Sequence, residues 1–280
     1  MNYYELTLEI QDFNHWKDIF VAYLAELEYE SFVEENACLK AYIQEENFDP
    51  KATHDLIFEL ASKGATLVGY HVQVIVQQNW NKDWETQFEP VLISDQLRIK
   101  APFHQLAPFN GLEVQILPKM SFGTGHHQTT HLVCQQMLSL DFNGKRVLDM
   151  GAGTGVLSIL AEFLGANQIV AIEIEEWSAE NIAENIVLNN CKRINAIHGG
   201  LESIPELIFD IVLANINKNI LLEHLKTYAN ILTRGGILLL SGFFVSDAPQ
   251  LVSAAEKIGF KFHGLYEREN WAALHLIKIT

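Results

Sequence analysis

Three glycines at alternate positions, Gly151, Gly153 and Gly155, follow a hydrophobic run in the segment VLDMGAGTGVLSIL, residues 147–160. Glycine has no Cβ, so a chain with this spacing can pass close to a bulky ligand. The residues that follow predict a helix, whose first turn offers unpaired N–H groups and the positive end of a dipole. The segment therefore predicts a strand, a loop and a helix that together bind a ligand at the end of the strand.

The glycine spacing restricts which ligand this loop could bind. A dinucleotide fingerprint, GxGxxG, would need glycine at position 156, where the chain has Val156. A P-loop would need Gly-Lys followed by Ser or Thr, and the loop contains no such triplet. The form Asp-x-Gly-x-Gly-x-Gly, which begins at Asp149, resembles the first motif of class I methyltransferases that use S-adenosylmethionine. A dinucleotide enzyme remains the alternative.

Two polar residues at the ends of later predicted strands could complete such a site. Glu173 lies 22 residues after Gly151, at the end of the strand VAIEI, where its carboxylate could accept both ribose hydroxyls. Asn215 lies at the end of the strand FDIVLANI, and in amine-methylating enzymes of this class an asparagine here holds the nucleophilic nitrogen. An ordinary turn asparagine is the alternative. We assign Asn215 to orientation of the amine and name no general base.

The segment FGTGHHQTTH, residues 122–131, contains three histidines, His126, His127 and His131. The last two would share a helix face, but no HExxH pattern and no third ligand accompany them, so we predict no metal site. The segment instead predicts a tight glycine loop, with Thr129 or Thr130 as N-cap of the next helix. We expect this loop to pack against the glycine turn at 151–155. The sequence leaves the roles of the histidines open.

The remaining patterns predict the elements that position these residues. Residues 129–280 alternate between strands and helices, which predicts an α/β fold with a mostly parallel sheet and helices on both faces. The last two strands, KFHGLYERE and WAALHLIKI, predict a terminal antiparallel hairpin, which is typical of class I methyltransferases. Before this region, VLISDQLRIK and GLEVQIL predict two short β segments. We take residues 91–280 as the methyltransferase domain.

The first 78 residues predict a separate, smaller α+β domain. The order of patterns is strand, helix, two strands, helix and strand, which is that of a ferredoxin-like sandwich. The segment NWNKDWETQFEP, residues 79–90, shows no periodicity and is predicted to be a linker. Its tryptophans, Trp80 and Trp84, could pack the domains together or line an entrance.

Charge and composition exclude several classes of protein. Residues 1–78 contain 14 Asp and Glu against four Lys, a net charge of −10 within a total of −16. Direct binding to nucleic acid is not expected of such a chain, whereas docking of a basic partner is one use of the charge and plain solubility the other. No apolar run reaches the roughly 18 residues of a membrane span. Three isolated cysteines and no secretory signal predict a cytoplasmic protein.

Several segments together resemble the PrmA family, the methyltransferases of large-subunit ribosomal protein eleven. PKMSFGTGHHQTTH resembles the family's FGTGTHPTT, NWNKDWETQFEP its NWxxxWxxxFxP linker, VLDMGAGTGVLSI its first cofactor motif and IVLANI its D-x-V-x-A-N-I strand. The resemblance covers nearly the whole chain and places cofactor contacts at Thr130, Gly151, Glu173 and Asn215. Gly153 and Gly155 complete the glycine loop.

The chain departs from the family pattern at a few positions. His126 replaces a threonine, Gln128 replaces a proline, and Glu173 occupies a position that is commonly aspartate. The DPG that often precedes the loop is replaced by Leu-Pro-Lys at 117–119. None of these changes removes a group that the chemistry needs.

The resemblance implies an enzyme that methylates lysine side chains of the basic ribosomal protein, with the N-terminal α-amine as a further candidate. The cofactor would be S-adenosylmethionine and the product S-adenosylhomocysteine, and residues 1–78 would recognise the substrate. Two alternatives stay open: a class I methyltransferase of another protein or a small molecule, and a non-catalytic assembly factor that binds the cofactor. The sequence leaves open the amines modified, the degree of methylation and the oligomeric state, for which a monomer is the expectation.

Overall fold

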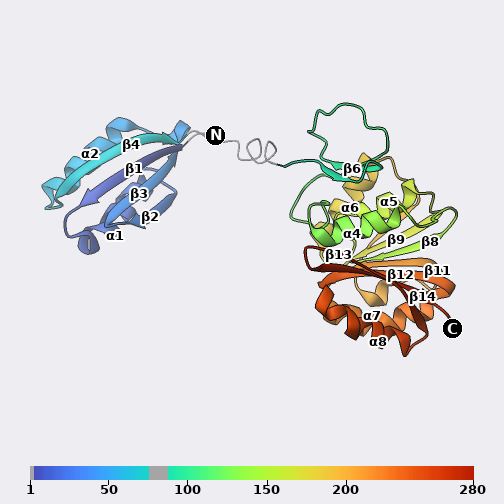
Figure 1. Ribbon diagram of the computed structural model, residues 1–280. Helices are drawn as coiled ribbons and strands as arrows, with labels where there is room; N and C mark the ends of the chain where they lie inside the picture. The colour runs from blue at the N-terminus through green and yellow to red at the C-terminus, as the bar shows by residue number, and fades with distance from the viewer. Residues whose placement is uncertain (1–2, 76–87) are drawn as a thin grey trace. The chain divides into compact units, whose positions relative to one another are not determined.

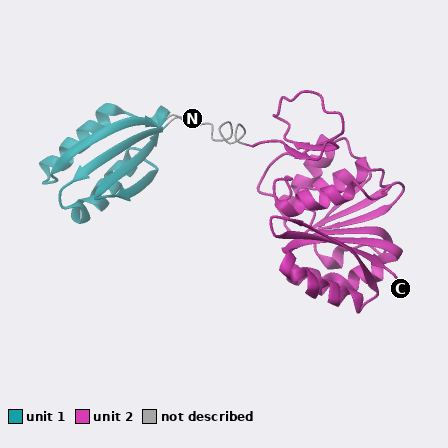
Figure 2. Ribbon diagram, viewed as in Figure 1, with its two compact units in different colours: residues 1–87 teal, residues 88–280 magenta. Residues whose placement is uncertain are grey.

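The computed structural model describes residues 3–75 and 88–280, which belong to two compact units, residues 1–87 and 88–280 (Figure 2). The predicted linker at 79–90 lies outside the described residues except for its last three. Trp80 and Trp84 also lie outside them, so both proposed roles of these tryptophans remain predictions. None of the helices in the described ranges combines the length and apolarity that crossing a membrane requires.

Unit 1 has the predicted ferredoxin-like arrangement. Its elements are β1 (Tyr3–Ile10), α1 (Phe13–Glu26), β2 (Ser31–Glu35), β3 (Cys38–Gln44), α2 (Pro50–Ser62) and β4 (Leu67–Ile75). The strands form an antiparallel sheet in the order β2-β3-β1-β4. Alternate residues of β1 and β3 pack on the helices, because strand side chains alternate between the two faces of a sheet.

Unit 2 is built on a seven-stranded sheet in the order β10-β9-β8-β11-β12-β14-β13. Its elements are β5 (Val91–Ile93), β6 (Leu97–Lys100), β7 (Leu112–Gln115), α4 (Gln128–Met137), β8 (Arg146–Met150), α5 (Val156–Phe163), β9 (Gln168–Glu173), α6 (Glu176–Leu188), β10 (Ile194–His198), β11 (Phe209–Asn215), α7 (Lys218–Ile231), β12 (Leu232–Phe244), α8 (Ala248–Glu256), β13 (Phe260–Arg268) and β14 (Trp271–Lys278). Strands β8 to β12 pair in parallel, and β14 runs antiparallel to both neighbours. The predicted sheet and terminal hairpin are confirmed.

Helices cover both faces of this sheet, as Figure 1 shows. Helices α4 and α5 bury apolar side chains on one face, and α7 and α8 bury theirs on the other. Burial on both faces explains why the central strands are continuous runs of apolar residues. The carboxyl ends of the parallel strands are left to the loops, which is where ligands of such sheets bind.

The prediction of a single β segment at VLISDQLRIK is wrong. The segment forms a hairpin, in which β5 pairs antiparallel with β6 and β6 pairs parallel with β7. The polar residues 94–96 form the turn, and Ser94 adopts a left-handed conformation with φ of 59°. These three polar residues were the turn signal that the β pattern around them obscured.

Candidate active site

The loop after β8 has glycine at three positions because other parts of the chain pack closely against its backbone. Gly151, Gly153 and Gly155 all have positive φ angles, of 73°, 57° and 79°. A Cβ on Gly151 would lie 2.3 Å from Cγ2 of Ile216, and a Cβ on Gly153 would lie 2.2 Å from the carbonyl oxygen of Phe122. The loop therefore requires glycine for its own conformation and packing as well as for any ligand.

The predicted contact between the loop at 122–126 and the glycine turn is confirmed. The N–H of Thr154 donates to the carbonyl of Phe122 at 2.9 Å, and the Thr154 hydroxyl donates to the carbonyl of Gly123 at 2.7 Å. Gly123 and Gly125 have φ angles of 104° and 94°, as a tight loop requires. The two loops form one wall at the carboxyl rim of the sheet.

The predicted N-cap of helix α4 is wrong by two or three residues. The cap is His127, whose Nδ1 accepts the N–H of Thr129 at 3.3 Å, and the helix begins at Gln128. Thr129 and Thr130 are buried in the first turn. An imidazole nitrogen can do the work of the usual hydroxyl or carboxylate, because the helix needs only an acceptor at this position.

The other two histidines in this segment hold neighbouring parts of the chain. Nε2 of His126 lies 2.9 Å from the carbonyl oxygen of Glu89, and Nε2 of His131 lies 3.1 Å from the Arg268 guanidinium. Within residues 3–75 and 88–280, no three His, Cys, Asp or Glu side chains come together as metal ligands would.

The Glu173 carboxylate is buried against the glycine loop. One oxygen accepts the N–H of Gly153 at 2.8 Å, and the other accepts the N–H groups of Ile174 and Glu175 at 2.9 and 3.2 Å. Glu173 thus joins the end of β9 to the loop after β8. Three backbone N–H donors thus fix the carboxylate in position.

Asp149, the acidic residue of the glycine motif, is fully buried at the end of β8. The Ser158 hydroxyl donates to Oδ2 at 2.7 Å, whereas Oδ1 has no partner within the described residues. Burial raises the pKa of Asp149 to about 7, and the charge of Glu173 adds to the effect. Such a perturbed carboxyl at a ligand-binding rim is typical of functional sites.

Asn215 lies on the same rim, at the end of β11. Its Nδ2 donates to Oγ1 of Thr130 at 3.3 Å, which fixes the orientation of the side-chain amide. Its Oδ1 is buried, and the described residues provide no donor to it. The structure thus brings two predicted site residues together and leaves one oriented acceptor, which a ligand N–H could fill.

A cavity of about 380 Å³ lies beside the glycine loop at the carboxyl ends of the strands. It is lined by Met150, Gly151, Ile172, Ile174, Gly199, Gly200, Leu201, Glu202, Ile216, Ile220, Glu223 and His224. The sequence motifs did not predict most of these residues. Gly199 and Gly200 directly after a strand, and the apolar Ile174 directly after Glu173, were the signals that could have identified them.

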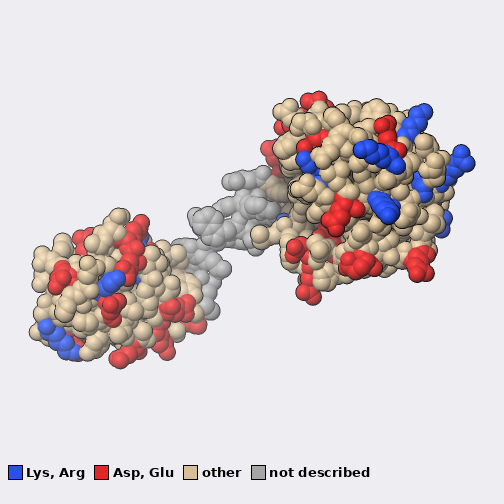
Figure 3. Space-filling model, turned by 90° about the horizontal axis from the view of Figure 1, so that it is seen from below, with Lys and Arg blue, Asp and Glu red and all other residues tan. Residues whose placement is uncertain are grey.

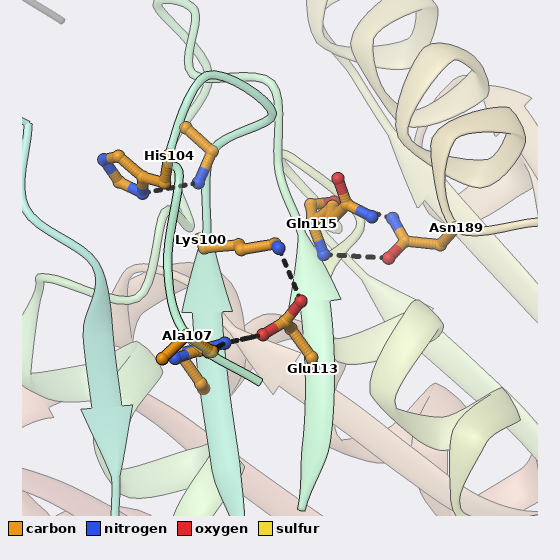
Figure 4. Close-up of polar contacts among 8 residues, drawn as sticks. Lys100, His104, Ala107, Glu113, Gln115 and Asn189 are labelled. Carbon is orange, nitrogen blue, oxygen red and sulfur yellow. Dashed lines mark hydrogen bonds and ion pairs between the residues drawn. The ribbon is translucent and has the colours of Figure 1, made fainter. Parts of the chain in front are cut away.

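Three asparagines, two on helix α6 and one at its C-cap, bind the segment at 115–117, and no sequence motif predicted them. Asn185 accepts the N–H of Leu117 at 2.8 Å and donates to the carbonyl of Thr154 at 2.9 Å. Asn189 accepts the N–H of Gln115 and donates to its carbonyl, at 2.8 and 2.6 Å (Figure 4). Asn181 adds a bond to the Leu117 carbonyl at 3.3 Å. Their spacing of four residues puts them on one helix face.

Neighbouring ion pairs stabilise the small sheet β5-β6-β7, which leads into the segment at 115–117. Glu113 of β7 pairs with both Lys100 and Arg98 of β6, and the Lys100 contact is 2.6 Å (Figure 4). Strand β7 then continues directly to the residues held by α6. The small sheet and α6 together fix where the loop at 122–126 begins.

Comparison with known proteins gives a consistent family assignment. The family profile described as "Ribosomal protein L11 methyltransferase (PrmA)" matches residues 6–278, which include parts of both units. A protein named Ribosomal protein L11 methyltransferase from Porphyromonas gingivalis is 41% identical over 272 residues, covering 96% of this chain and 92% of the relative. A protein of the same name from Phocaeicola vulgatus is 38% identical over 280 residues, covering 99% of both chains.

A solved structure shares the fold. The crystal structure of a ribosomal protein L11 methylase from Lactobacillus delbrueckii subsp. bulgaricus aligns with a TM-score of 0.64 and 25% sequence identity. The alignment covers 69% of this chain and all of the other. The similarity therefore holds in three dimensions as well as in sequence.

Proposed function

The chain belongs to the ribosomal protein L11 methyltransferase (PrmA) family, and from this premise we propose that it methylates lysine side-chain amines of ribosomal protein L11. The N-terminal α-amine of the same protein is a second candidate acceptor. The observation that supports the proposal is the buried, unpartnered Oδ1 of Asn215, an acceptor at the end of β11 that the amine could fill.

The cofactor is S-adenosyl-L-methionine, and the residues at the rim fit it. The cavity combines apolar walls, at Ile172, Ile174 and Ile216, with the backbone of Gly151 from the glycine loop, as a nucleoside requires. We assign cofactor binding to Thr130, Gly151, Gly153, Gly155, Glu173 and Asn215. When bound, the cofactor supplies a methyl group on a positively charged sulfur and leaves as S-adenosylhomocysteine, while the amine's proton passes to water.

The work left to the protein is to present a neutral, oriented amine. A lysine with a pKa near 10.4 must lose a proton first, which costs roughly 4 to 5 kcal/mol at pH 7. Burial at the rim lowers that cost, because desolvation disfavours the charged form. Asn215 Oδ1 accepts one N–H of the neutral amine and so directs its lone pair. We assign no general base.

We assign recognition of the protein substrate to residues 1–78. Their net charge of −10 complements a basic ribosomal protein, and acidic side chains predominate among the charged residues on the face of unit 1 drawn in Figure 3. Opposite charge on two partners speeds their encounter and orients it. The same charge disfavours direct binding to nucleic acid. We place the enzyme in the cytoplasm, where its substrate is made, and expect it to act as a monomer.

Incubation of the protein with methyl-labelled S-adenosylmethionine and isolated L11 tests the proposed activity. We expect label on lysines of L11, located by mass spectrometry, and a loss of at least about 100-fold in kcat/KM for Asn215→Ala. Label found only on a small metabolite would contradict the proposed substrate. If calorimetry detected no cofactor binding, an assembly factor without catalysis would become the better explanation.

A second experiment tests the docking role of the acidic unit. Glu9, Asp18 and Glu46 are exposed, and replacing them by Gln, Asn and Gln should raise the KM for L11 several-fold at low salt. The cofactor dissociation constant should not change. An unchanged KM would argue that the charge of unit 1 serves only solubility.

A further inference from the structure

A second cavity, of about 300 Å³, lies on the same rim between the start of α7, the end of β12 and the start of β14. It is lined by Asn217, Lys218, Asn219, Gly242, Phe243, Phe244, Asp247 and Trp271. The two cavities meet at one short segment, because Ile216 lines the first and Asn217 lines the second. Ile216 and Asn217 thus form a partition between the two cavities. Asn215, whose Oδ1 is the unpartnered acceptor, directly precedes this partition.

The walls of the second cavity suit an alkyl chain. The rings of Phe244 and Trp271 lie 4.2 Å apart between centroids, and His127 packs edge-on against Trp271 at 4.7 Å. Phe244 and Trp271 both retain exposed surface. Aromatic faces of this kind attract both methylene groups and the positive charge that a lysine carries at its end.

The cavity also contains an internal ion pair. Nζ of Lys218, the first residue of α7, lies 2.8 Å from Oδ1 of Asp247. The N–H of Phe244 donates to the other oxygen of Asp247 at 3.2 Å. The hydrogen bond from Lys218 is the main cause that lowers the pKa of Asp247. The carboxylate is thus ionised and already paired.

The other charged groups near this cavity are engaged elsewhere. At the tip of the β13–β14 hairpin, Arg268 donates to Gln128 and contacts His131, and Glu269 accepts from Gln128. His127 caps α4 and has its pKa lowered by burial, so it is neutral at pH 7. On α7, Glu223 lines the first cavity. Lys218 and Asp247 are therefore the charged groups that line the second cavity.

We propose that the second cavity receives the target lysine side chain, and that Lys218 neutralises Asp247 so that the arriving amine is not held as an ammonium ion. The inference rests on the proposed function and assigns its acceptor site. Phe244 and Trp271 enclose the alkyl stem, and the nitrogen reaches the partition beside Asn215. Lys218 acts through Asp247 and is a positioning residue.

The charge balance of the cavity matters because only a neutral amine can accept the methyl group. An unpaired carboxylate within a few ångströms of an amine raises the amine's pKa by about one unit or more. Each unit reduces the neutral fraction at pH 7 about tenfold. A free Asp247 would bind the substrate more tightly and make it less reactive. Paired with Lys218, the same carboxylate leaves the cavity without net charge.

The test compares Lys218→Gln, Asp247→Asn and the double variant, measured with L11 between pH 6 and 10. Lys218→Gln should lower KM, lower kcat about tenfold at pH 7.5 and move the rise of kcat about one unit to higher pH. Asp247→Asn should raise KM and move the rise to lower pH. The double variant, again without net charge in the cavity, should return close to the parent profile. Lys226→Gln removes one exposed charge from the same helix and should change nothing.

An equilibrium measurement accompanies the kinetics. A lysine peptide of L11 should bind the complex with S-adenosylhomocysteine several-fold more tightly in Lys218→Gln and more weakly in Asp247→Asn. If the parent enzyme methylates L11, but the three cavity variants all show its pH profile and its peptide affinity, the inference is overturned. Absence of L11 methylation by the parent enzyme would instead refute the proposed function.

Discussion

The carboxylate of Glu173 accepts the N–H of Gly153 at 2.8 Å, so the end of β9 and the loop after β8 are joined directly. Two further N–H groups, from Ile174 and Glu175, bind the other oxygen. A carboxylate offers about four acceptor positions, and three are used. Glu173 can therefore accept one ribose hydroxyl without change, and a second only by sharing an acceptor position or releasing an N–H. Glu173 therefore has a structural role beside the cofactor-binding role that we propose for it.

Glu173→Gln should lower both thermal stability and cofactor affinity. The amide would direct N–H groups at backbone donors and leave at least one of them unpaired, at a cost of about 1–3 kcal/mol. Differential scanning calorimetry and titration calorimetry measure the two effects. Glu180→Gln, an exposed change on α6, is the control. Lost cofactor affinity with an unchanged melting temperature would show that the bond to Gly153 contributes nothing to the fold.

Gly153→Ala should weaken cofactor binding at least tenfold. The new Cβ would meet the Phe122 carbonyl oxygen at 2.2 Å, so the loop at 122–126 must move away. Gly144→Ala is the matched control, because Gly144 also has a positive φ, of 71°, but has open space around it. Both variants incur the backbone cost of about 1 kcal/mol, and only Gly153→Ala incurs the collision. Equal cofactor affinities in the two variants would contradict this account.

Asn185→Ala should destabilise the protein by about 2–3 kcal/mol. The change leaves the Leu117 N–H and the Thr154 carbonyl without their partner, and Thr154 belongs to the glycine loop. Cofactor affinity should fall together with stability. Asn195→Ala, at an exposed position of β10, should have little effect on either measurement. A stable variant with weakened cofactor binding would mean that the asparagine acts only on the ligand.

Asp149→Asn should raise stability at pH 8 and remove one part of its pH dependence. The folded pKa of Asp149 is raised to about 7 from 3.8, so the folded state holds a proton that the unfolded state releases. The protonated carboxyl therefore contributes to the free energy of unfolding at low pH. This contribution, about 4 kcal/mol at most, is lost as the pH rises from about 4 to 7. Denaturant unfolding of the ligand-free protein across this range measures it. Asp141→Asn, an exposed change, should leave the pH dependence intact.

His275→Leu should remove a loss of stability in acid. His275 is buried beside His263 with Nε2 unpaired within the described residues, and burial lowers its pKa to about 4. The unfolded state binds a proton first, so stability is complete above pH 6.5 and is lost as the pH falls towards 4. The loss is up to about 3 kcal/mol. Over much of this pH range Asp149 changes the stability in the opposite direction. The slopes of unfolding free energy against pH that remain in Asp149→Asn and His275→Leu should therefore differ in sign. A slope unchanged from the parent in His275→Leu would contradict the assignment.

The sequence by itself determined the elements and the class of site. The glycine spacing at 151–155 and the apolar runs of β8, β9 and β11 are properties of consecutive residues, so they predict a strand, a loop and a helix without knowledge of the fold. The parallel strands β8 to β12 then bring Glu173 and Asn215 to one rim, because parallel strands end on the same side of the sheet. The polar turn at Ser94 was missed since its β-rich flanks dominated the pattern.

Only the tertiary structure decided what each side chain at the rim contacts. Asn185 holds Leu117, which lies 68 residues earlier, and Lys218 pairs with Asp247, which lies 29 residues later. Neither pairing has a local signature, because the partners meet only after the sheet and its helices have assembled. For the same reason the sequence showed that residue 151 has no side chain, but not that Ile216 occupies the space where one would lie.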